Sequence, residues 1–420
     1  MSVLIKDVQL AGRATSIYIE GNRIAAIGDS AKTEADTVID GKAKAAVPGF
    51  VNTHTHAAMT LLRSYADDVP LQTWLEKAIW PQEAKIEPED IYWGTKLACL
   101  EMIKGGTTCF NDMYFHMDQA ARAVKEMGLR AVLSEGFIDM RDPGLGQQLL
   151  KKQQSTLRKI EGVGTDRVRA ALGPHAIYTV SKESLLAMKD LSDRKGYLLH
   201  LHLSETQREV EDCLTEQGMR PAKYLDSIGF LSRQTLAAHG CWLEAEEIDL
   251  LARHGVKVSH CPTSNMKLAA GRAMPLKALR EAGVLVSLGT DGPASNNNLD
   301  MLESMKFAAL LQKFASDDAT VAPAAQVFEM ATLGGARALG VDAGLVEEGR
   351  LADIALVDLR RPELSPAHDL TSLLVYSAHG NVVDTVICDG QVLMRGRKVP
   401  GEAEIVRKAA EAGRELVSRE

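Results

Sequence analysis

The sequence lacks the features that mark secreted, membrane-bound and nucleic-acid-binding proteins. Its six cysteines form no CxxC pair, its N-terminal stretch has no signal-peptide pattern, and no apolar run reaches the ~20 residues that span a bilayer. Lys and Arg number 48 against 56 Asp and Glu, and no basic block supplies the clustered cations that phosphates require. We therefore expect a cytoplasmic protein that binds neither membranes nor nucleic acids.

The composition is that of an ordinary globular chain. Of its 420 residues, 45% are hydrophobic and 25% are charged, which is enough to build a large core. No GxGxxG glycine fingerprint follows an early strand, so a dinucleotide-binding fold is disfavoured. There is also no internal repeat and no low-complexity linker.

The middle of the chain alternates short apolar strands with longer helical stretches. Helices are predicted at 89–103, 117–127, 205–217 and 244–254. Eight strands alternating with helices predict a parallel sheet, and eight is the number that closes a barrel. The alternative is an open, doubly wound sheet. The strands are predicted at 46–51, 107–111, 130–134, 168–173, 198–204, 235–239, 257–260 and 284–289.

The two ends of the chain differ from this middle and resemble each other. Residues 16–19 and 23–28 flank Gly-Asn, and residues 384–394 contain Asp-Gly between apolar runs, which are both hairpin signals. A further strand is predicted at 352–357, and a charged amphipathic helix at 402–420. The ends therefore predict β structure followed by one surface helix.

Seven of the eleven histidines lie at the ends of the predicted middle strands, where barrel enzymes carry their chemistry. His54 and His56, at i and i+2, point to one side of an extended strand, and neutral imidazoles are ligands for zinc or iron. His202 adds a third nitrogen and Asp291 an oxygen. This set leaves one position of a metal ion open for water.

Each of these residues also has a structural interpretation. His54 and His56 can be an incidental pair on a loop, and His202 a buried strand histidine. Asp291 lies in Thr-Asp-Gly-Pro, which is turn chemistry. His200 shares a face with His202, but we leave it outside the ligand set because Glu205 lies one helical turn beyond His202. The joint occurrence at strand ends favours a metal site over core packing.

Taken in chain order, these segments resemble the amidohydrolase superfamily. The segments are 48–56 (PGFVNTHTH), 202–206 (HLSET), 239–240 (HG), 259–265 (SHCPTSN), 289–292 (GTDG) and 349–354 (GRLADI). Residues 61–68 (LLRSYADD), 74–75 (WL) and 80–84 (WPQEA) are similar to its deaminases of 5′-methylthioadenosine, S-adenosylhomocysteine and 5′-deoxyadenosine. The resemblance implies a (β/α)8 barrel over 48–344. It also implies a small β-sandwich domain, with a C-terminal helix, from 1–47 and 345–420.

The resemblance also implies a metal site. Carried over by position, it assigns the ligands His54, His56, His202 and Asp291. Two-metal members of the superfamily bridge their ions through a modified lysine at the end of the fourth strand, and residues 168–175 contain no lysine. We therefore expect one ion per subunit, zinc in the first instance, with ferrous iron as the alternative.

The remaining site residues implied by the resemblance serve catalysis and substrate binding. Glu205 delivers a proton to N1 of adenine, His239 orients the attacking water, and Asp291 passes the water's proton to the departing ammonia. Glu83 holds the ribose hydroxyls, since one carboxylate can accept from both, and His175 touches the purine. Glu205 and Asp291 also contact the substrate. General acid–base help of this kind contributes roughly 10²–10⁴ in rate per group.

The implied activity is hydrolytic deamination of 5′-modified adenosines, with adenosine itself as a further candidate substrate, to inosine analogues and ammonia. One alternative is the same scaffold acting on guanine, an oxidised purine, a pterin or a triazine. Another is an inactive barrel, which the presence of all four ligands disfavours. Arg141 either pairs with the amino-acid carboxylate of S-adenosylhomocysteine or is a solvated loop residue. Because barrels of this family often form symmetric oligomers, we expect a homo-oligomer.

Overall fold

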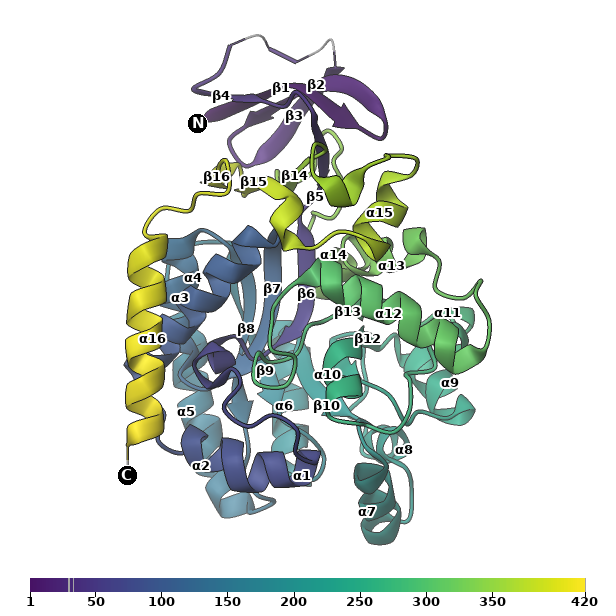
Figure 1. Ribbon diagram of the computed structural model, residues 1–420. Coiled ribbons are helices and arrows are strands. Elements are labelled where there is room, and N and C mark those ends of the chain that lie inside the picture. Colours follow the sequence, from purple (N-terminus) through teal and green to yellow (C-terminus); the bar gives the residue numbers. More distant parts are fainter. Residues whose placement is uncertain (29–30, 33, 420) are drawn as a thin grey trace.

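A computed structural model describes residues 1–28, 31–32 and 34–419. The described chain contains two eight-stranded sheets, one wholly parallel and one mixed. Figure 1 shows the mixed sheet at one end of the molecule and the short helices α1 (Leu71–Thr73) and α2 (Trp80–Glu83) at the other. Among the described residues, no helix combines the length and apolar composition needed to cross a bilayer.

The parallel sheet confirms the predicted barrel. Its strands follow one another in space in chain order, from the first to the eighth. The Asp291 N–H, just past the eighth strand, donates to the His54 carbonyl on the first, and this bond brings the two edges together. The strands are β6 (Phe50–Thr55), β7 (Thr107–Tyr114), β8 (Arg130–Phe137), β9 (Val168–Pro174), β10 (Leu199–Leu203), β11 (Thr235–His239), β12 (Lys257–His260) and β13 (Val286–Leu288).

Helices separate consecutive barrel strands, as right-handed crossovers require. Their ends carry ordinary caps: Ser181 accepts from the Ser184 N–H at the start of α6, and Gly196 ends it in the left-handed conformation at φ 75°. Besides α1 and α2, the α-helices between barrel strands are α3 (Pro88–Lys104), α4 (Met117–Met127), α5 (Pro143–Glu161), α6 (Lys182–Lys195), α7 (Gln207–Gln217), α8 (Pro221–Ser227), α9 (Ala245–His254), α10 (Pro262–Lys267) and α11 (Leu276–Glu281). After the barrel come α12 (Met301–Ser316), α13 (Ala324–Met330), α14 (Leu333–Leu339), α15 (Leu370–Tyr376) and α16 (Glu402–Ser418).

The mixed sheet is assembled from both ends of the chain, as the paired hairpin signals predict. Strand β5 pairs antiparallel with β14, with Val47 opposite Ala355, which joins the N-terminal and C-terminal strands. The order is β16-β15-β14-β5-β1-β2-β3, and β4 pairs with β1. The strands are β1 (Ser2–Leu10), β2 (Arg13–Glu20), β3 (Arg23–Ile27), β4 (Thr37–Asp40), β5 (Lys44–Pro48), β14 (Ile354–Asp358), β15 (Val383–Cys388) and β16 (Gln391–Met394).

The prediction of one strand over 46–51 was wrong. The chain leaves β5 at Pro48 and enters β6 at Phe50, so this apolar run belongs to two different sheets. A Cβ on Gly49 would lie 2.3 Å from the Thr108 hydroxyl oxygen, so only glycine fits at this transition. Residues 46–51 therefore connect the mixed sheet to the barrel.

Two predicted helices differ by two residues at one end from those observed, and the helices α3 and α9 differ by a single residue at one or both ends. Helix α7 begins at Gln207 rather than 205, because Ser204 adopts a left-handed φ of 49° and the Thr206 side chain caps the helix by accepting from the Glu209 N–H. Helix α16 ends at Ser418, and position 420 lies outside the described residues. In Figure 1, α16 runs along the barrel beside α3, to which the Lys104–Glu402 ion pair (2.5 Å) joins it.

Candidate metal and active site

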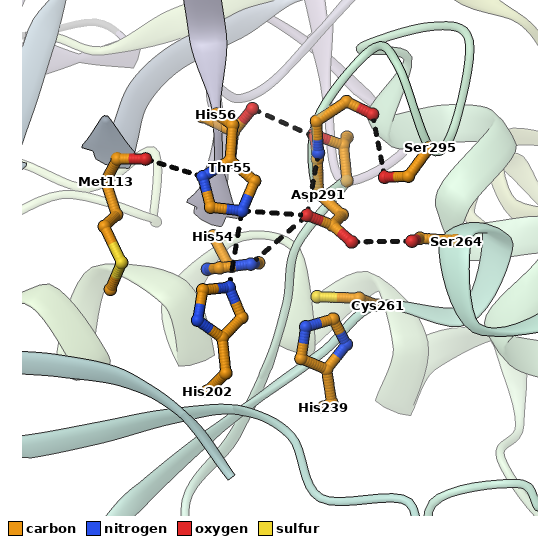
Figure 2. A network of polar contacts seen from close by, with 12 residues as sticks. His54, Thr55, His56, Met113, His202, His239, Cys261, Ser264, Asp291 and Ser295 are labelled. Atoms are coloured by element: carbon orange, nitrogen blue, oxygen red, sulfur yellow. Dashed lines mark hydrogen bonds and ion pairs between the residues drawn. The ribbon is translucent and has the colours of Figure 1, made fainter. Parts of the chain in front are cut away.

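The carboxyl ends of the barrel strands bring the four predicted ligands together. The Nε2 atoms of His54 and His56 each lie 3.3 Å from Oδ1 of Asp291. Nε2 of His202 lies 3.3 Å from Nε2 of His56. Figure 2 shows the three rings and the carboxylate facing one another. His54 and Asp291 are 0% and 5% exposed, so the cluster is shielded from bulk water.

The hydrogen bonds on the far side of the rings orient them as ligands. Nδ1 of His56 donates to the Met113 carbonyl (2.6 Å), and Nδ1 of His202 donates to the His175 carbonyl (2.8 Å). The neutral forms of these rings therefore carry lone pairs on the two Nε2 atoms that face each other. Lone pairs at 3.3 Å repel unless a proton or a cation lies between them, so the arrangement fits a bound cation.

The spacing and chemistry of these donors also fit a metal ion. Ligand atoms that share one ion through bonds of ~2.1 Å lie roughly 3–4 Å apart, and three separations among these donors are 3.3 Å. Nε2 of His54 is buried and has no hydrogen-bond partner among the described residues. Burial lowers the pKa of His54 to about 4 and that of His202 well below its usual value, which keeps both rings neutral and able to bind a metal.

Charge within the cluster is set by Asp291. Burial alone would raise its pKa, but the close approach of the His54 and His56 rings holds it well below the usual range. Burial also lowers the pKa of His56, which the Asp291 carboxylate more than offsets, raising it to about 9. A proton and a metal ion therefore compete for His56. The second carboxylate oxygen of Asp291 accepts from the Ser264 hydroxyl at 2.6 Å.

One pocket at this end of the barrel contains most of the predicted site residues. Its lining includes His56, Glu83, His175, His202, Glu205, His239 and Asp291, and His54 lies directly behind this wall. Much of the remaining wall is apolar or aromatic; it comes mainly from the segment around α1 and α2 and from the ends of β7 and β8, with one residue after β9 and one after α10. That part of the lining comprises Met59, Leu71, Trp74, Leu75, Ile79, Trp80, Met113, Tyr114, Phe115, Ile138, Tyr178 and Leu268.

The acid–base groups lie beside the cluster. Burial raises the pKa of Glu205, which favours its protonated form and suits a proton donor. Oε1 of Glu205 is 3.9 Å from Nδ1 of His239. Burial also raises the pKa of Glu83, on α2, and lowers that of His175 to about 3. The structure thus gathers all the predicted site residues, and their roles remain predictions.

The structure gives several site residues hydrogen-bond partners that their sequence positions do not pair with them. His200, left outside the ligand set, places Nε2 2.7 Å from Nδ1 of His54, and its own Nδ1 lies 3.0 Å from the Asn111 amide nitrogen. Asn265 and Ser264 on α10 contact His239 and Asp291. The SHCPTSN motif contained these two α10 residues, but nothing in its spacing assigned them partners.

Arg141 is not among the residues that line this pocket. Its guanidinium pairs with Glu216, near the end of α7, and its side chain is 38% exposed. The backbone turns sharply there, with φ 61°, and the Arg141 N–H donates to Asp139. The solvated-loop interpretation therefore describes Arg141 in this structure.

Comparisons with known proteins agree with this geometry. The model of the amidohydrolase family matches residues 45–393. The chain is 51% identical over 388 residues to a 5′-deoxyadenosine deaminase of Methanospirillum hungatei, covering 92% of this chain and 86% of that one. It is 50% identical over 404 residues to 5-methylthioadenosine/S-adenosylhomocysteine deaminase 1 of Archaeoglobus fulgidus, covering 96% and 95%. An adenosine deaminase from Xanthomonas campestris with bound zinc superposes with a TM-score of 0.93 at 35% identity, over 99% of both chains.

Proposed function

Because the chain belongs to the amidohydrolase family, we propose that it hydrolyses the exocyclic amine of 5′-modified adenosines, giving inosine analogues and ammonia. The proposal rests on one observation. Side chains that can bind a metal ion and buried acid–base groups lie together at one pocket. The names of two relatives about 50% identical to this chain support the substrate class.

The donor set fits one divalent metal ion, and we assign zinc. His54, His56, His202 and Asp291 would hold it, a set of three imidazoles and one carboxylate that zinc favours. When bound, such an ion lowers the pKa of water to about 7 and makes hydroxide available at neutral pH. The zinc in the Xanthomonas campestris deaminase supports this assignment.

The protein's own residues handle the protons. Glu205, whose pKa burial raises, donates to N1 of the adenine ring and makes C6 electrophilic. Asp291 accepts a proton from the attacking water and delivers it to the amino group, which leaves as ammonia. The oxygen now bonded to C6 still carries one hydrogen, and this proton passes to Glu205 as the C6 carbonyl forms. His239 donates a hydrogen bond to the attacking oxygen.

The remaining pocket residues select the nucleoside. Glu83 accepts from the two ribose hydroxyls and His175 contacts the purine. Among the described residues that line the pocket there is no lysine or arginine, and Arg141 is paired with Glu216. A charged amino-acid tail would find no cation there. The pocket therefore favours a small apolar 5′ substituent, as in 5′-deoxyadenosine and 5′-methylthioadenosine, over S-adenosylhomocysteine.

A substrate profile of the purified protein tests this function. We expect ammonia release from 5′-deoxyadenosine and 5′-methylthioadenosine with kcat/KM at least about tenfold above that for S-adenosylhomocysteine, a charge-assisted contact being worth roughly 1.5–3 kcal/mol. A 2′,3′-dideoxy substrate should lose a similar factor because Glu83 has no diol to hold. Release from guanine, with none from any adenosine, would contradict the proposal.

Location and assembly complete the proposal. The six cysteines are buried and free, which supports a reducing, cytoplasmic setting. We assign a homo-oligomer, on the ground that barrels of this family often associate symmetrically. Sedimentation of the purified protein measures its mass directly.

A further inference from the structure

The short helix α10 delivers two adjacent side chains to two different residues of the site. Ser264 donates to Oδ2 of Asp291 at 2.6 Å, and the amide nitrogen of Asn265 lies 2.9 Å from Nδ1 of His239. Ser264 and His239 are 0% exposed and Asn265 is 4% exposed. Both contacts are therefore shielded from bulk water.

The Asn265–His239 contact determines where His239 carries its proton. An amide nitrogen has two hydrogens and no acceptor capacity, so Nδ1 of His239 must accept. A neutral imidazole that accepts at Nδ1 carries its hydrogen on Nε2. Glu205, whose Oε1 is 3.9 Å from Nδ1, is beyond hydrogen-bond distance and does not compete for that nitrogen.

The proton on Nε2 is the one that the reaction needs. Nε2 of His239 is buried and has no partner among the described residues, although His239 lines the substrate pocket. A buried N–H without a partner costs about 1–3 kcal/mol, so a substrate or water oxygen that accepts from it is bound more strongly. The opposite tautomer would present a lone pair to that oxygen and repel it.

We propose that Asn265 is a positioning residue that fixes the Nε2–H tautomer of His239, so that His239 donates to the attacking oxygen. This inference rests on the proposed deamination, in which His239 is the donor. Asn265 itself touches neither the substrate nor the four metal-type ligands in the contacts described. Its effect therefore falls on the chemical step and leaves metal binding unchanged.

Two substitutions separate this role from simple packing. Asn265→Asp keeps the size of the side chain but offers only an acceptor, so Nδ1 takes the hydrogen and Nε2 loses it. Asn265→Ala removes the contact and leaves both tautomers accessible. In pH profiles we expect kcat to fall at least about 10²-fold in Asn265→Asp at the alkaline end, where the ring beside the new carboxylate has lost its second proton, and about tenfold in Asn265→Ala. KM should stay within about threefold and bound metal per subunit should not change.

A packing role predicts the reverse order, since aspartate fills the space that alanine leaves empty. If Asn265→Asp retained as much kcat as Asn265→Ala, the proposal would therefore be overturned. Gln312→Glu is the control, because it also replaces a buried side-chain amide by a carboxylate. Gln312 is 7% exposed and donates to the Met274 carbonyl at 3.0 Å, so its variant should keep wild-type kcat.

The tautomer can also be observed without any Asn265 variant. In ¹⁵N spectra of the labelled holoenzyme, with His239 assigned by comparison with His239→Gln, we expect hydrogen on Nε2. Hydrogen on Nδ1 in the wild type would overturn the inference, whatever the activity. A wild type that shows the Nε2–H form but deaminates no adenosine would instead refute the proposed function.

Discussion

At the scale of single residues, Glu205 provides the sharpest test of the proton transfers. Replacement by glutamine keeps the side chain's shape but removes the acidic proton, so ring N1 is not protonated. We expect Glu205→Gln to lower kcat by roughly 10²–10⁴, with little change in KM or in bound metal. Steady-state kinetics with 5′-deoxyadenosine, together with metal analysis, measure this effect.

Glu211→Gln, on the exposed side of α7, is the matched control and should keep wild-type rates. If Glu205→Gln retained full kcat, another group would have to protonate the base. Loss of metal from Glu205→Gln would contradict its placement outside the ligand set.

The sequence predicted which side chains meet at the carboxyl end of the barrel but not the residues that orient them. His54, His56, His202 and Asp291 each lie at the end of a barrel strand, and strand ends meet by topology alone. Asn265 is 26 residues from His239, and His200 is 146 residues from His54. Such contacts depend on how loops and rings are oriented in space, which neither composition nor periodicity encodes.

At the scale of elements, the first turn of α7 holds the loop that carries Glu205. The Glu209 carboxylate accepts from the N–H groups of Ser204 and Glu205, both at 2.8 Å. Burial raises the pKa of Glu209 to about 8, although these two bonds favour its ionised form. The position of Glu205 is therefore linked to a group that titrates near neutral pH.

This linkage predicts how stability depends on pH. The pKa of Glu209 in the folded protein lies above its ordinary value of 4.5, so the folded state binds this proton more tightly than the unfolded chain. Its contribution to stability is complete below about pH 4.5 and is lost as pH rises through about 8, with a slope of up to about 1.4 kcal/mol per pH unit.

We therefore expect the free energy of unfolding to decline less between about pH 5 and pH 8 in Glu209→Gln than in the wild type. Urea unfolding at several pH values measures the two slopes. Asp112, whose pKa burial raises to about 7, contributes equally in both proteins. Parallel pH curves for the two proteins would contradict the assignment to Glu209.

The boundaries of helices and strands show where the spacing of apolar residues no longer predicts the structure. The helix predicted at 117–127 is observed as α4 at the same residues, because an amphipathic pattern and a glycine stop define it. No sequence pattern marks the division of 46–51 into β5 and β6, because both strands are apolar. The division follows from the close approach of Gly49 to Thr108, which is a tertiary contact.

At the scale of the whole molecule, a buried ion pair joins the barrel to the mixed sheet. Nε of Arg130, at the start of β8, lies 3.1 Å from Asp353, and its Nη2 lies 2.9 Å from Asp389. The side chains of Arg130 and Asp353 are 7% and 1% exposed. Removing the arginine leaves a buried carboxylate without its cation.

We expect Arg130→Met to lower the free energy of unfolding by about 3–5 kcal/mol, the usual cost of leaving a buried charge unpaired. Arg350→Met is the matched control, because its partner Asp342 is 47% exposed. Solvent screens that pair, so its loss should cost less than about 1 kcal/mol. Urea unfolding measures both variants, and equal effects would contradict the role of the buried pair.

We propose that residues 1–47 and 345–420 form one domain and 48–344 the other. A separate apolar core supports this division, because it draws on both ends of the chain. Its members are Val3, Ile5, Val8, Ile17, Ile19, Ile24, Ile39, Ala46, Ala352, Ile354, Leu356 and Ile387. Helix α16 belongs to the first of these domains but packs beside α3 of the barrel, so it also connects the two domains.

The pairing of β5 with β14 has a consequence for biosynthesis. About 300 residues separate Pro48 from Ile354, so the ribosome completes the whole barrel before the partner of β5 emerges. At ~5–20 residues per second this takes roughly 15–60 s. During that interval the edge of β5 is open to non-native pairing, and the nascent chain depends on rapid barrel closure or on chaperones to protect it.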